Sequence, residues 1–494
     1  MSGLLAPWTD GGATGSLHVI GASGAEGVAL LLFLVDELGL EGVVAHDFSA
    51  DQRAFARSFR KANTAWERPE REAILKRLLR LPIELRLGDQ YLRGLDEAQL
   101  IFASQNWFNY PSNLPALPDA VAAGAQLRGV VDLAMDLFPG VRVGVTGSNG
   151  KSTTAGLVAW MLRAALPDGS RLLHGGNDRD AQVALADLRG ASPADRLVWE
   201  VSNRHLRDRV VPVDVGVLTN ITRNHIEDHG SFEAYVAAKA RLLLGTGPRG
   251  QAVLTAGDPH SQELLPSVRE HVGTVWVAGA PSDEPEDGSV WLDGDAVLLR
   301  RPGASGVESV GDASTFTLPG AHNRQNLLSA VAGAVAAGAE VKALEAAWSR
   351  FPALPGRLEL VAEHEGIRWV YDIQATTAPA AEAGIRAIGG DRTTVLVVGG
   401  ADKGMDYTGM ADAAGRHCRA VVALPGTGSD AFLAAAPALP RVLADDLDAG
   451  LARARDLAQP GDTVLVSPGC AFFSSRFVAG RSFHGRVRAL LGTA

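Results

Sequence analysis

The chain has 494 residues and a formal net charge of −10 at pH 7. Hydrophobic residues make up 46% of it and charged residues 21%, which is the balance of a soluble globular protein. The acidic balance argues against non-specific nucleic-acid binding, which needs a basic surface. Cys418 and Cys470 form no CxxC pair, so neither a zinc site nor a disulfide framework is expected, and a reducing cytoplasm is the expected compartment. No signal peptide is recognised, and Asp36 and Glu37 interrupt the longest apolar run, so no membrane insertion is expected.

The first block, residues 1–138, begins with the strand-like run "SLHVI", a glycine turn and an apolar helical run. The runs "EGVVAHDF" and "QLIFAS" follow as further strands, and strands that alternate with helices predict a Rossmann-like parallel sheet. The turn has glycines at 21, 24 and 27, but Ser23 stands where the fingerprint GxGxxG has its middle glycine. A purely structural turn is therefore the alternative to a ligand-binding one.

The second block, residues 139–354, opens with the strand "RVGVTG" and the loop "SNGKST". Gly147 and Gly150 allow a tight turn whose N–H groups point inward, Lys151 can reach the β- and γ-phosphates, and Ser152 can offer its hydroxyl to Mg²⁺. A helix expected from Thr153 would direct its positive end at the anion. The candidate nucleotide-binding residues are Gly147, Ser148, Asn149, Gly150, Lys151, Ser152 and Thr153.

The loop is a variant P-loop, because Val145 stands where the strict pattern GxxxxGK[ST] has glycine. A plain strand-to-helix turn and other P-loop classes (switch GTPase, motor ATPase, kinase) are the alternatives, although no NKxD-type guanine motif is found. The strands "RLVWEVS", "VGVLTN" and "GQAVLTA" follow, then an acid-rich loop with small strands and the Ala-rich helix "HNRQNLLSAVAGAVAAG". These elements predict a central parallel sheet of the P-loop ATPase type.

The third block, residues 355–494, begins after the Pro/Gly punctuation "FPALPGR" with a hairpin turned at "HEG". The strands "TTVLVVGG", "AVVALPG" and "DTVLVSPG" then alternate with helical runs, which predicts a second Rossmann-like domain. The expected architecture is therefore α/β with three domains, over residues 1–138, 139–354 and 355–494.

Five motifs occur in one order: "GSNGKST", "WEVSN", "LTNITRNHIEDHGSFEAYVAAKARLLL", "LPGAHNRQNLLSA" and, in the third block, "VYDIQATT". Together they resemble the Mur ligase family, ATP-dependent amino-acid ligases of peptidoglycan precursor synthesis. The resemblance implies transfer of the γ-phosphoryl of ATP to a substrate carboxylate. An amino-acid amine then attacks the acyl phosphate, and the products are an amide and phosphate.

The resemblance implies two Mg²⁺ ions and a modified lysine. Ser152 and Glu200 match ligands of one ion, and His225 matches a ligand of the second. Lys239 matches a lysine that CO₂ carbamylates, so Lys151, His225 and Lys239 become the candidate catalytic residues. A strand-end surface acid is the alternative for Glu200, and a solvated helix lysine is the alternative for Lys239. His229 shares helical spacing with His225, but zinc is discounted because no third ligand is evident.

Three further residues match ATP contacts: Asn323 the adenine, Arg357 an arginine that reaches ATP across a domain gap, and Asp372 an acid that holds the nucleotide. Domain closure over the nucleotide is therefore expected, which would exclude water from the acyl phosphate. A helix cap is a second role open to Asn323. In the first block, Ser23 and Asp47 become candidate contacts for a uridine diphosphate group.

The third block most resembles the branch that joins glutamate to UDP-N-acetylmuramoyl-L-alanine, with Thr376, Lys403 and Ser467 at matching substrate positions. Gln374 stands where that branch has lysine, Phe472 stands where it has serine, and the following loop is shorter. D-glutamate is the family default and L-glutamate the rival. A folylpolyglutamate-type or other poly-amino-acid ligase and an inactive nucleotide-binding relative are further alternatives. The expected partners are these small molecules and no nucleic acid, and a cytoplasmic monomer is expected.

Overall fold

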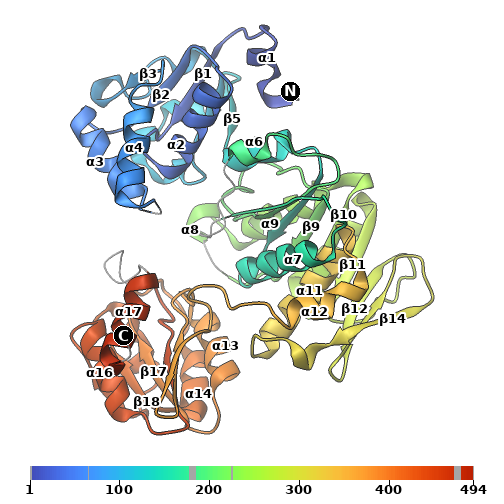
Figure 1. Ribbon diagram of the computed structural model, residues 1–494, viewed down its shortest axis with the longest axis vertical. Helices are drawn as coiled ribbons and strands as arrows, with labels where there is room; N and C mark the ends of the chain where they lie inside the picture. The colour runs from blue at the N-terminus through green and yellow to red at the C-terminus, as the bar shows by residue number, and fades with distance from the viewer. Residues whose placement is uncertain (1–2, 65, 177–184, 224–225, 472–479, 493–494) are drawn as a thin grey trace. The chain divides into compact units, whose positions relative to one another are not determined.

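The computed structural model describes residues 3–64, 66–176, 185–223, 226–471 and 480–492, and three β-sheets organise them (Figure 1). Two compact units contain these sheets. The first unit comprises residues 1–292, 298–309 and 329–344, and the second comprises 293–297, 310–328 and 345–494. The predicted α/β class and its three sheets are confirmed, whereas the boundaries at 138 and 354 stay predictions. Within the described residues, no helix is long and apolar enough to cross a bilayer.

The first sheet has the strand order β3-β2-β1-β4-β5, and all its neighbouring strands are parallel. Its strands are β1 Ser16–Ile20, β2 Val43–His46, β3 Glu84–Arg86, β4 Ala98–Phe102 and β5 Gln126–Arg128. The helices of this region are α1 Ala6–Thr9, α2 Ala25–Leu31, α3 Gln52–Ala62, α4 Arg68–Leu78, α5 Ala116–Ala122 and α6 Val130–Leu137. Strands β2 and β3 are added on one side of β1, and β4 and β5 are added on the other side. The strand order therefore reverses between β1 and β4, and this switch point is where ligands bind in such folds.

The middle sheet has the order β14-β13-β12-β11-β10-β9-β6-β8-β7, with parallel pairing from β12 through β7. Its strands are β6 Val141–Thr146, β7 Leu172–Gly175, β8 Arg196–Glu200, β9 Val215–Leu218, β10 Gln251–Thr255, β11 Thr274–Ala278, β12 Gly288–Asp293, β13 Ala296–Arg300 and β14 Val307–Asp312. Its helices are α7 Lys151–Ala165, α8 Ile226–His229, α9 Phe232–Leu244, α10 Pro259–His271, α11 Ala321–Ala336 and α12 Leu344–Trp348. The central strands of this sheet are buried on both faces, as parallel strands covered by helices require.

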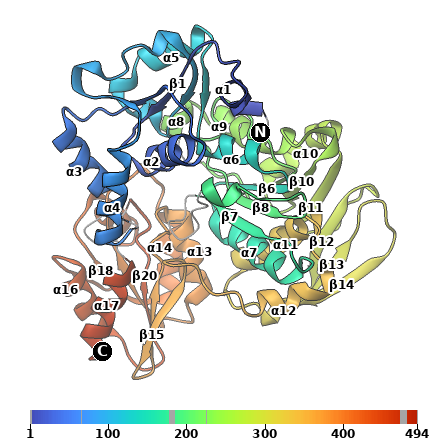
Figure 2. The same cartoon turned by 45° about the horizontal axis from the view of Figure 1, so that its top comes forward.

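The third sheet has the order β15-β16-β20-β17-β18-β19. Its strands are β15 Glu359–His364, β16 Ile367–Tyr371, β17 Thr394–Val398, β18 Cys418–Ala423, β19 Arg441–Leu443 and β20 Thr463–Val466. The predicted hairpin is confirmed, because β15 and β16 are the antiparallel pair of an otherwise parallel sheet. Helices α13 Ala378–Ile388 and α14 Thr408–His417 cover one face, while α16 Leu447–Leu457 and α17 Gly480–Leu491 cover the other (Figures 1 and 2); α15 is Thr427–Ala435.

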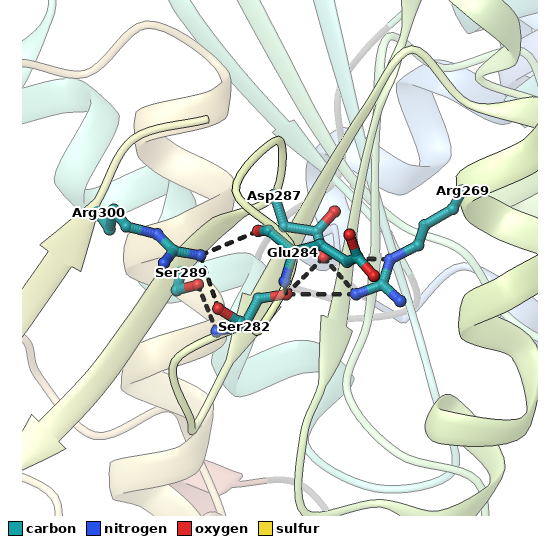
Figure 3. A network of polar contacts seen from close by, with 6 residues as sticks. All are labelled: Arg269, Ser282, Glu284, Asp287, Ser289 and Arg300. Carbon is teal, nitrogen blue, oxygen red and sulfur yellow. Dashed lines mark hydrogen bonds and ion pairs between the residues drawn. The ribbon is translucent and has the colours of Figure 1, made fainter. Parts of the chain in front are cut away.

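A polar network stabilises the loop between β11 and β12 (Figure 3). Asp287 is buried and accepts hydrogen bonds from Arg269 on α10 at 2.6 Å and from the Ser282 hydroxyl at 2.7 Å. Arg300 of β13 donates to the carbonyl oxygens of Ser282 and Glu284 at 2.7 and 3.0 Å. Arg269 therefore pairs with the buried carboxylate of this acid-rich loop, and Arg300 satisfies two of its carbonyl groups.

We expect Asp287→Ala to destabilise this loop by about 2–3 kcal/mol, since it leaves Arg269 and Ser282 without their shared acceptor. Amide hydrogen exchange over β11 and β12 should quicken accordingly. Glu308→Ala is the matched control, because its ion pair with Arg301 is exposed at both ends and should contribute less than about 1 kcal/mol. Equal effects of the two substitutions on exchange would contradict this account.

Candidate functional site

The predicted phosphate loop joins β6 to α7 in the middle sheet. Gly147 has φ of 153°, and a side chain there would place its Cβ 1.9 Å from the hydroxyl oxygen of Thr219. Gly150 has φ of 80°, a left-handed conformation that glycine adopts without strain. The helix begins at Lys151 and not at Thr153 as predicted. The first turn of the helix therefore contains Lys151 and Ser152, and the amino end of the helix lies at the loop.

The segment after the neighbouring strand β9 holds the phosphate loop in place. The backbone N–H of Ser148 donates to the Asn220 carbonyl at 2.8 Å, and that of Asn149 donates to the Asn220 side-chain oxygen at 2.9 Å. The Thr219 hydroxyl donates to the Asn149 carbonyl at 2.6 Å. Sequence reasoning missed Thr219 and Asn220, although their position at the end of a strand beside β6 was a signal available in "VGVLTN". The loop conformation is thus set by these contacts of the protein itself.

Glu200 ends β8, and its carboxylate accepts a hydrogen bond from the Ser152 hydroxyl at 2.6 Å. Glu200 is buried, so the strand-end surface interpretation is wrong. The two side chains form a compact pair of hard oxygen donors beside the phosphate loop, which is the ligand chemistry that Mg²⁺ prefers. No cluster of three or more His, Cys, Asp or Glu side chains that could hold a metal ion occurs among the described residues. His225 lies outside the described residues.

Lys239, on α9, is 1% exposed, so the solvated-lysine interpretation is wrong. Its ammonium group donates to the Gly147 carbonyl at 2.7 Å and lies 4.6 Å from the centre of the Tyr235 ring. Burial, followed by the positive charge of Lys151, holds the pKa of Lys239 well below its usual value, while Glu200 acts in the opposite direction. The phosphate loop, the Glu200 carboxylate and a lysine with a weakened hold on its proton therefore occupy one buried cluster.

Tyr235 also contacts the loop, since its hydroxyl lies 2.9 Å from the Ser148 hydroxyl. The ammonium group of Lys151 donates to the Ser148 carbonyl at 3.0 Å. Two lysines thus bind neighbouring carbonyls of a single loop, one from α7 and one from α9. Tyr235 could not be predicted from the sequence, because its residue type in the helix pattern is that of an ordinary core aromatic.

In the first sheet, Ser23 and Asp47 lie together at the carboxyl ends of β1 and β2. The buried Asp47 carboxylate accepts the N–H of Ser23 at 2.9 Å and, at its other oxygen, the hydroxyl of Ser49 at 2.6 Å. The His46 carbonyl accepts the N–H groups of Gly21 and the residue after it, at 2.8 and 3.0 Å. Asp47 therefore holds the glycine turn through its side chain.

Two large aromatic side chains lie exposed at the same edge of the first sheet. Phe48 follows β2 and is 56% exposed, while Tyr110 lies in the loop after β4 and is 45% exposed. Their rings are stacked, 6.3 Å apart and 24° from parallel. The pair therefore presents a flat aromatic surface at this edge of the sheet. The sequence analysis did not single out either residue.

In the third sheet, Asp372 follows β16 and is buried, and its carboxylate accepts the Ser467 hydroxyl at 2.9 Å and the Leu358 N–H at 3.2 Å. Burial raises the pKa of Asp372 to about 7, although both hydrogen bonds and the charge of Arg357 oppose this shift. The structure therefore brings together Asp372, Ser467 and the backbone next to Arg357.

Two of the predicted substrate contacts of the third block, Thr376 and Lys403, lie next to each other, because the ammonium group of Lys403 donates to the Thr376 carbonyl at 3.2 Å. The Gln374 side chain, which replaces the lysine of the related branch, is exposed. Phe472 lies outside the described residues.

Asn323 lies in the first turn of α11, which begins at Ala321, so Asn323 is not the N-cap. Its side-chain amide donates to the Pro319 carbonyl at 2.8 Å, and its side-chain oxygen accepts from Asn326 at 3.2 Å. The helix-cap interpretation is therefore wrong. The side chain instead joins the start of the helix to the segment that precedes it.

Comparison with known proteins agrees with this geometry. The model of the Mur ligase middle domain matches residues 145–334, and that of the Mur ligase glutamate ligase domain matches residues 356–470. A UDP-N-acetylmuramoylalanine–D-glutamate ligase of Symbiobacterium thermophilum is 31% identical over 437 residues, covering 86% of this chain and 92% of that protein. The chain belongs to the Mur ligase family. The ligase of the same name from Pelotomaculum thermopropionicum is 34% identical over 392 residues, covering 79% of this chain and 82% of that protein.

Solved structures of Mur ligases share the fold. UDP-N-acetylmuramate-alanine ligase MurC of Thermotoga maritima matches with a TM-score of 0.56 at 14% identity, over 96% of this chain and 99% of that one. MurF of Acinetobacter baumannii matches with a TM-score of 0.53 at 17% identity, over 76% of this chain and 87% of that one. Mur ligases use ATP to form a C–N bond, so this chain is an ATP-dependent ligase.

The raised pKa of Asp372 makes the stability of the third sheet depend on pH. Between about pH 4 and about pH 7 the folded chain retains a proton that the unfolded chain has released. The free energy of unfolding should therefore fall as pH rises through this range, by at most about 1.4 kcal/mol per pH unit. Amide hydrogen exchange of β16, β17 and β20 at several pH values measures it.

Asp372→Asn should flatten this dependence, because an amide has no proton to lose. Asp412→Asn, at an exposed position on α14, is the matched control and should leave the slope as it is. An unchanged slope in Asp372→Asn would show that other groups cause the pH dependence.

Proposed function

We propose that this chain is the ligase that adds D-glutamate to UDP-N-acetylmuramoyl-L-alanine at the expense of ATP, in peptidoglycan precursor synthesis. The observation that carries the proposal is the buried cluster of the phosphate loop, Ser152–Glu200 and Lys239. Relatives 31–34% identical over most of their length are named for this reaction. The same names favour D-glutamate over L-glutamate, and they do not favour the folylpolyglutamate-type alternative.

Phosphoryl transfer depends on positioning and on neutralising charge. The loop residues Gly147 to Thr153 would bind the phosphates of ATP through those N–H groups that do not donate to Asn220 and through the Lys151 ammonium group. Ser152, Glu200 and His225 would hold two Mg²⁺ ions, which neutralise charge on the phosphates and the substrate carboxylate. The carboxylate oxygen bonds to the γ-phosphorus as the bond to ADP breaks. The amine of glutamate then bonds to the carbonyl carbon, phosphate leaves, and the amine loses a proton.

Lys239 is proposed to carry a carbamate. Its environment favours the neutral amine, which attacks CO₂ to form the carbamate with release of a proton. The product is an anion beside Lys151, so the interaction that disfavours the charged lysine becomes attractive. The modified side chain would help hold the metal ions.

The first sheet is proposed to bind the uridine diphosphate group near Ser23 and Asp47. Phe48 and Tyr110 support this placement, since an exposed stacked pair at the switch-point edge offers a flat surface to a nucleobase.

In the third sheet, Thr376, Lys403 and Ser467 are the proposed glutamate contacts. Arg357, Asp372 and Asn323 are the proposed ATP contacts beyond the loop. The substrates place the reaction in the cytoplasm, where we propose that the chain acts as a monomer.

Phosphate release from ATP tests the function when UDP-N-acetylmuramoyl-L-alanine is supplied with D- or L-glutamate in parallel. D-glutamate should support turnover, and Lys151→Ala should lose at least about a hundredfold in kcat because a phosphate-binding cation is removed. Lys342→Ala is the matched control, since that lysine is exposed and its salt bridge is with Glu340. Turnover with L-glutamate alone would assign the chain to the rival branch. Turnover with neither enantiomer, but with another amino acid, would disprove the assignment.

Carbamylation of Lys239 predicts that activity depends on CO₂. Enzyme in CO₂-depleted buffer should lose activity and regain it when bicarbonate is added, and labelled bicarbonate should give a carbamate carbon signal by NMR. Lys239→Arg should lose both the signal and the dependence, because a guanidinium group does not form the carbamate. Lys342→Arg should keep both. A labelled signal that persists in Lys239→Arg would place the modification elsewhere.

A further inference from the structure

We propose that Arg204 is a positioning residue. It fixes the loop after β4 of the first sheet relative to helix α8 and to the segment after β8 in the middle sheet. Arg204 lies in the segment Ser202–Arg207, which begins two residues after Glu200. Its guanidinium group contacts two other segments, one on each side. This inference rests on the proposed function, because Arg204 would set the position of the UDP-linked substrate relative to the site of phosphoryl transfer.

Both contacts of Arg204 are short and directional. Its Nε donates to Oδ2 of Asp228 on α8 at 2.6 Å, and its Nη1 donates to the side-chain oxygen of Asn106 at 2.7 Å. The Asp228 side chain is only 3% exposed and that of Arg204 is 28% exposed, so solvent screens this ion pair less than a surface pair. The planar guanidinium group donates in two fixed directions, which an ammonium group does not reproduce.

Three neighbouring side-chain contacts also join this segment to the loop after β4 or to helix α8. The Ser202 hydroxyl donates to the Gln105 side-chain oxygen, and the Asn203 amide lies 3.0 Å from Nε2 of His229. The guanidinium carbon of Arg207 lies 4.0 Å from the centre of the Phe108 ring. The segment 202–207 therefore lies between the loop after β4 and helix α8, and its polar side chains bind both.

The positions of these partners give the contacts a functional consequence. The loop after β4 is at the switch point of the first sheet and leads to Tyr110 of the exposed aromatic pair. Helix α8 begins directly after His225, and Glu200 precedes the segment. A substrate bound at the first sheet must present its carboxylate to the γ-phosphate, and an error of about 1 Å can cost about a hundredfold in rate. Arg204 fixes this register by binding Asn106 and Asp228 at once.

Binding of UDP-N-acetylmuramoyl-L-alanine to the full chain, measured by calorimetry without ATP or Mg²⁺, tests the proposal. Arg204→Met and Asn106→Ala should each raise Kd roughly tenfold or more, because each breaks a charge-assisted hydrogen bond that orders the loop. ATP affinity should stay within about twofold of the wild-type value, which also shows that the middle sheet is folded. Arg301→Met, which breaks an exposed ion pair with Glu308, is the matched control and should change neither value.

The double variant Asn106→Ala with Arg204→Met should bind no more weakly than Arg204→Met alone, since both changes remove one interaction. Arg204→Lys should rescue little, and added methylguanidinium should partly restore binding to Arg204→Ala. An unchanged substrate Kd in Arg204→Met, an equal loss of ATP affinity, or additive effects of the two substitutions would overturn the role of Arg204 and leave the proposed function standing. Failure of the wild-type chain to bind the UDP-linked substrate would overturn both.

Discussion

The main electrostatic constraint on the phosphate loop of the middle sheet is the burial of Lys239 against it. An ammonium group without water is costly, and the Gly147 carbonyl and the Tyr235 ring compensate only part of that cost. Lys151 lies near enough to add electrostatic repulsion, while Glu200 supplies attraction. A nucleotide phosphate or a carbamate would relieve the excess of positive charge. A fold that tolerates this arrangement in its core keeps electrostatic energy available for an anion.

The surrounding structure keeps the cluster from relaxing. The loop N–H groups bind Asn220, the Thr219 hydroxyl binds the Asn149 carbonyl, and the Ser148 hydroxyl reaches Tyr235. These partners come from the segment after β9 and from α9. Parallel strands place their following loops at one edge, which is why residues up to about 90 positions apart in sequence meet there. The phosphate loop therefore has its conformation set by contacts within the protein.

The sequence predicted the parts of the fold that local patterns encode. Long apolar runs identified β1, β4 and β6, and the glycine–lysine pattern identified the phosphate loop. Strands β3 and β5 were missed, since each has three residues of mixed polarity and depends on pairing with its neighbour. Lys239 and Glu200 were singled out through family resemblance, but their burial was not predictable, because it is set by side chains distant in sequence. Thr219, Asn220 and Tyr235 were not predicted for the same reason. The helix-cap role open to Asn323 was wrong, because α11 begins at Ala321.

The hydrogen bond between Lys151 and the Ser148 carbonyl gives the loop an internal placeholder. Without a bound phosphate, the Lys151 ammonium group donates to the Ser148 carbonyl, so the lysine side chain is held beside the loop. A phosphate bound at this loop would displace a neutral carbonyl from Lys151, and the charge-assisted hydrogen bond formed in exchange is the stronger of the two. Phosphate binding at this loop would therefore begin with the exchange of one acceptor of Lys151 for another.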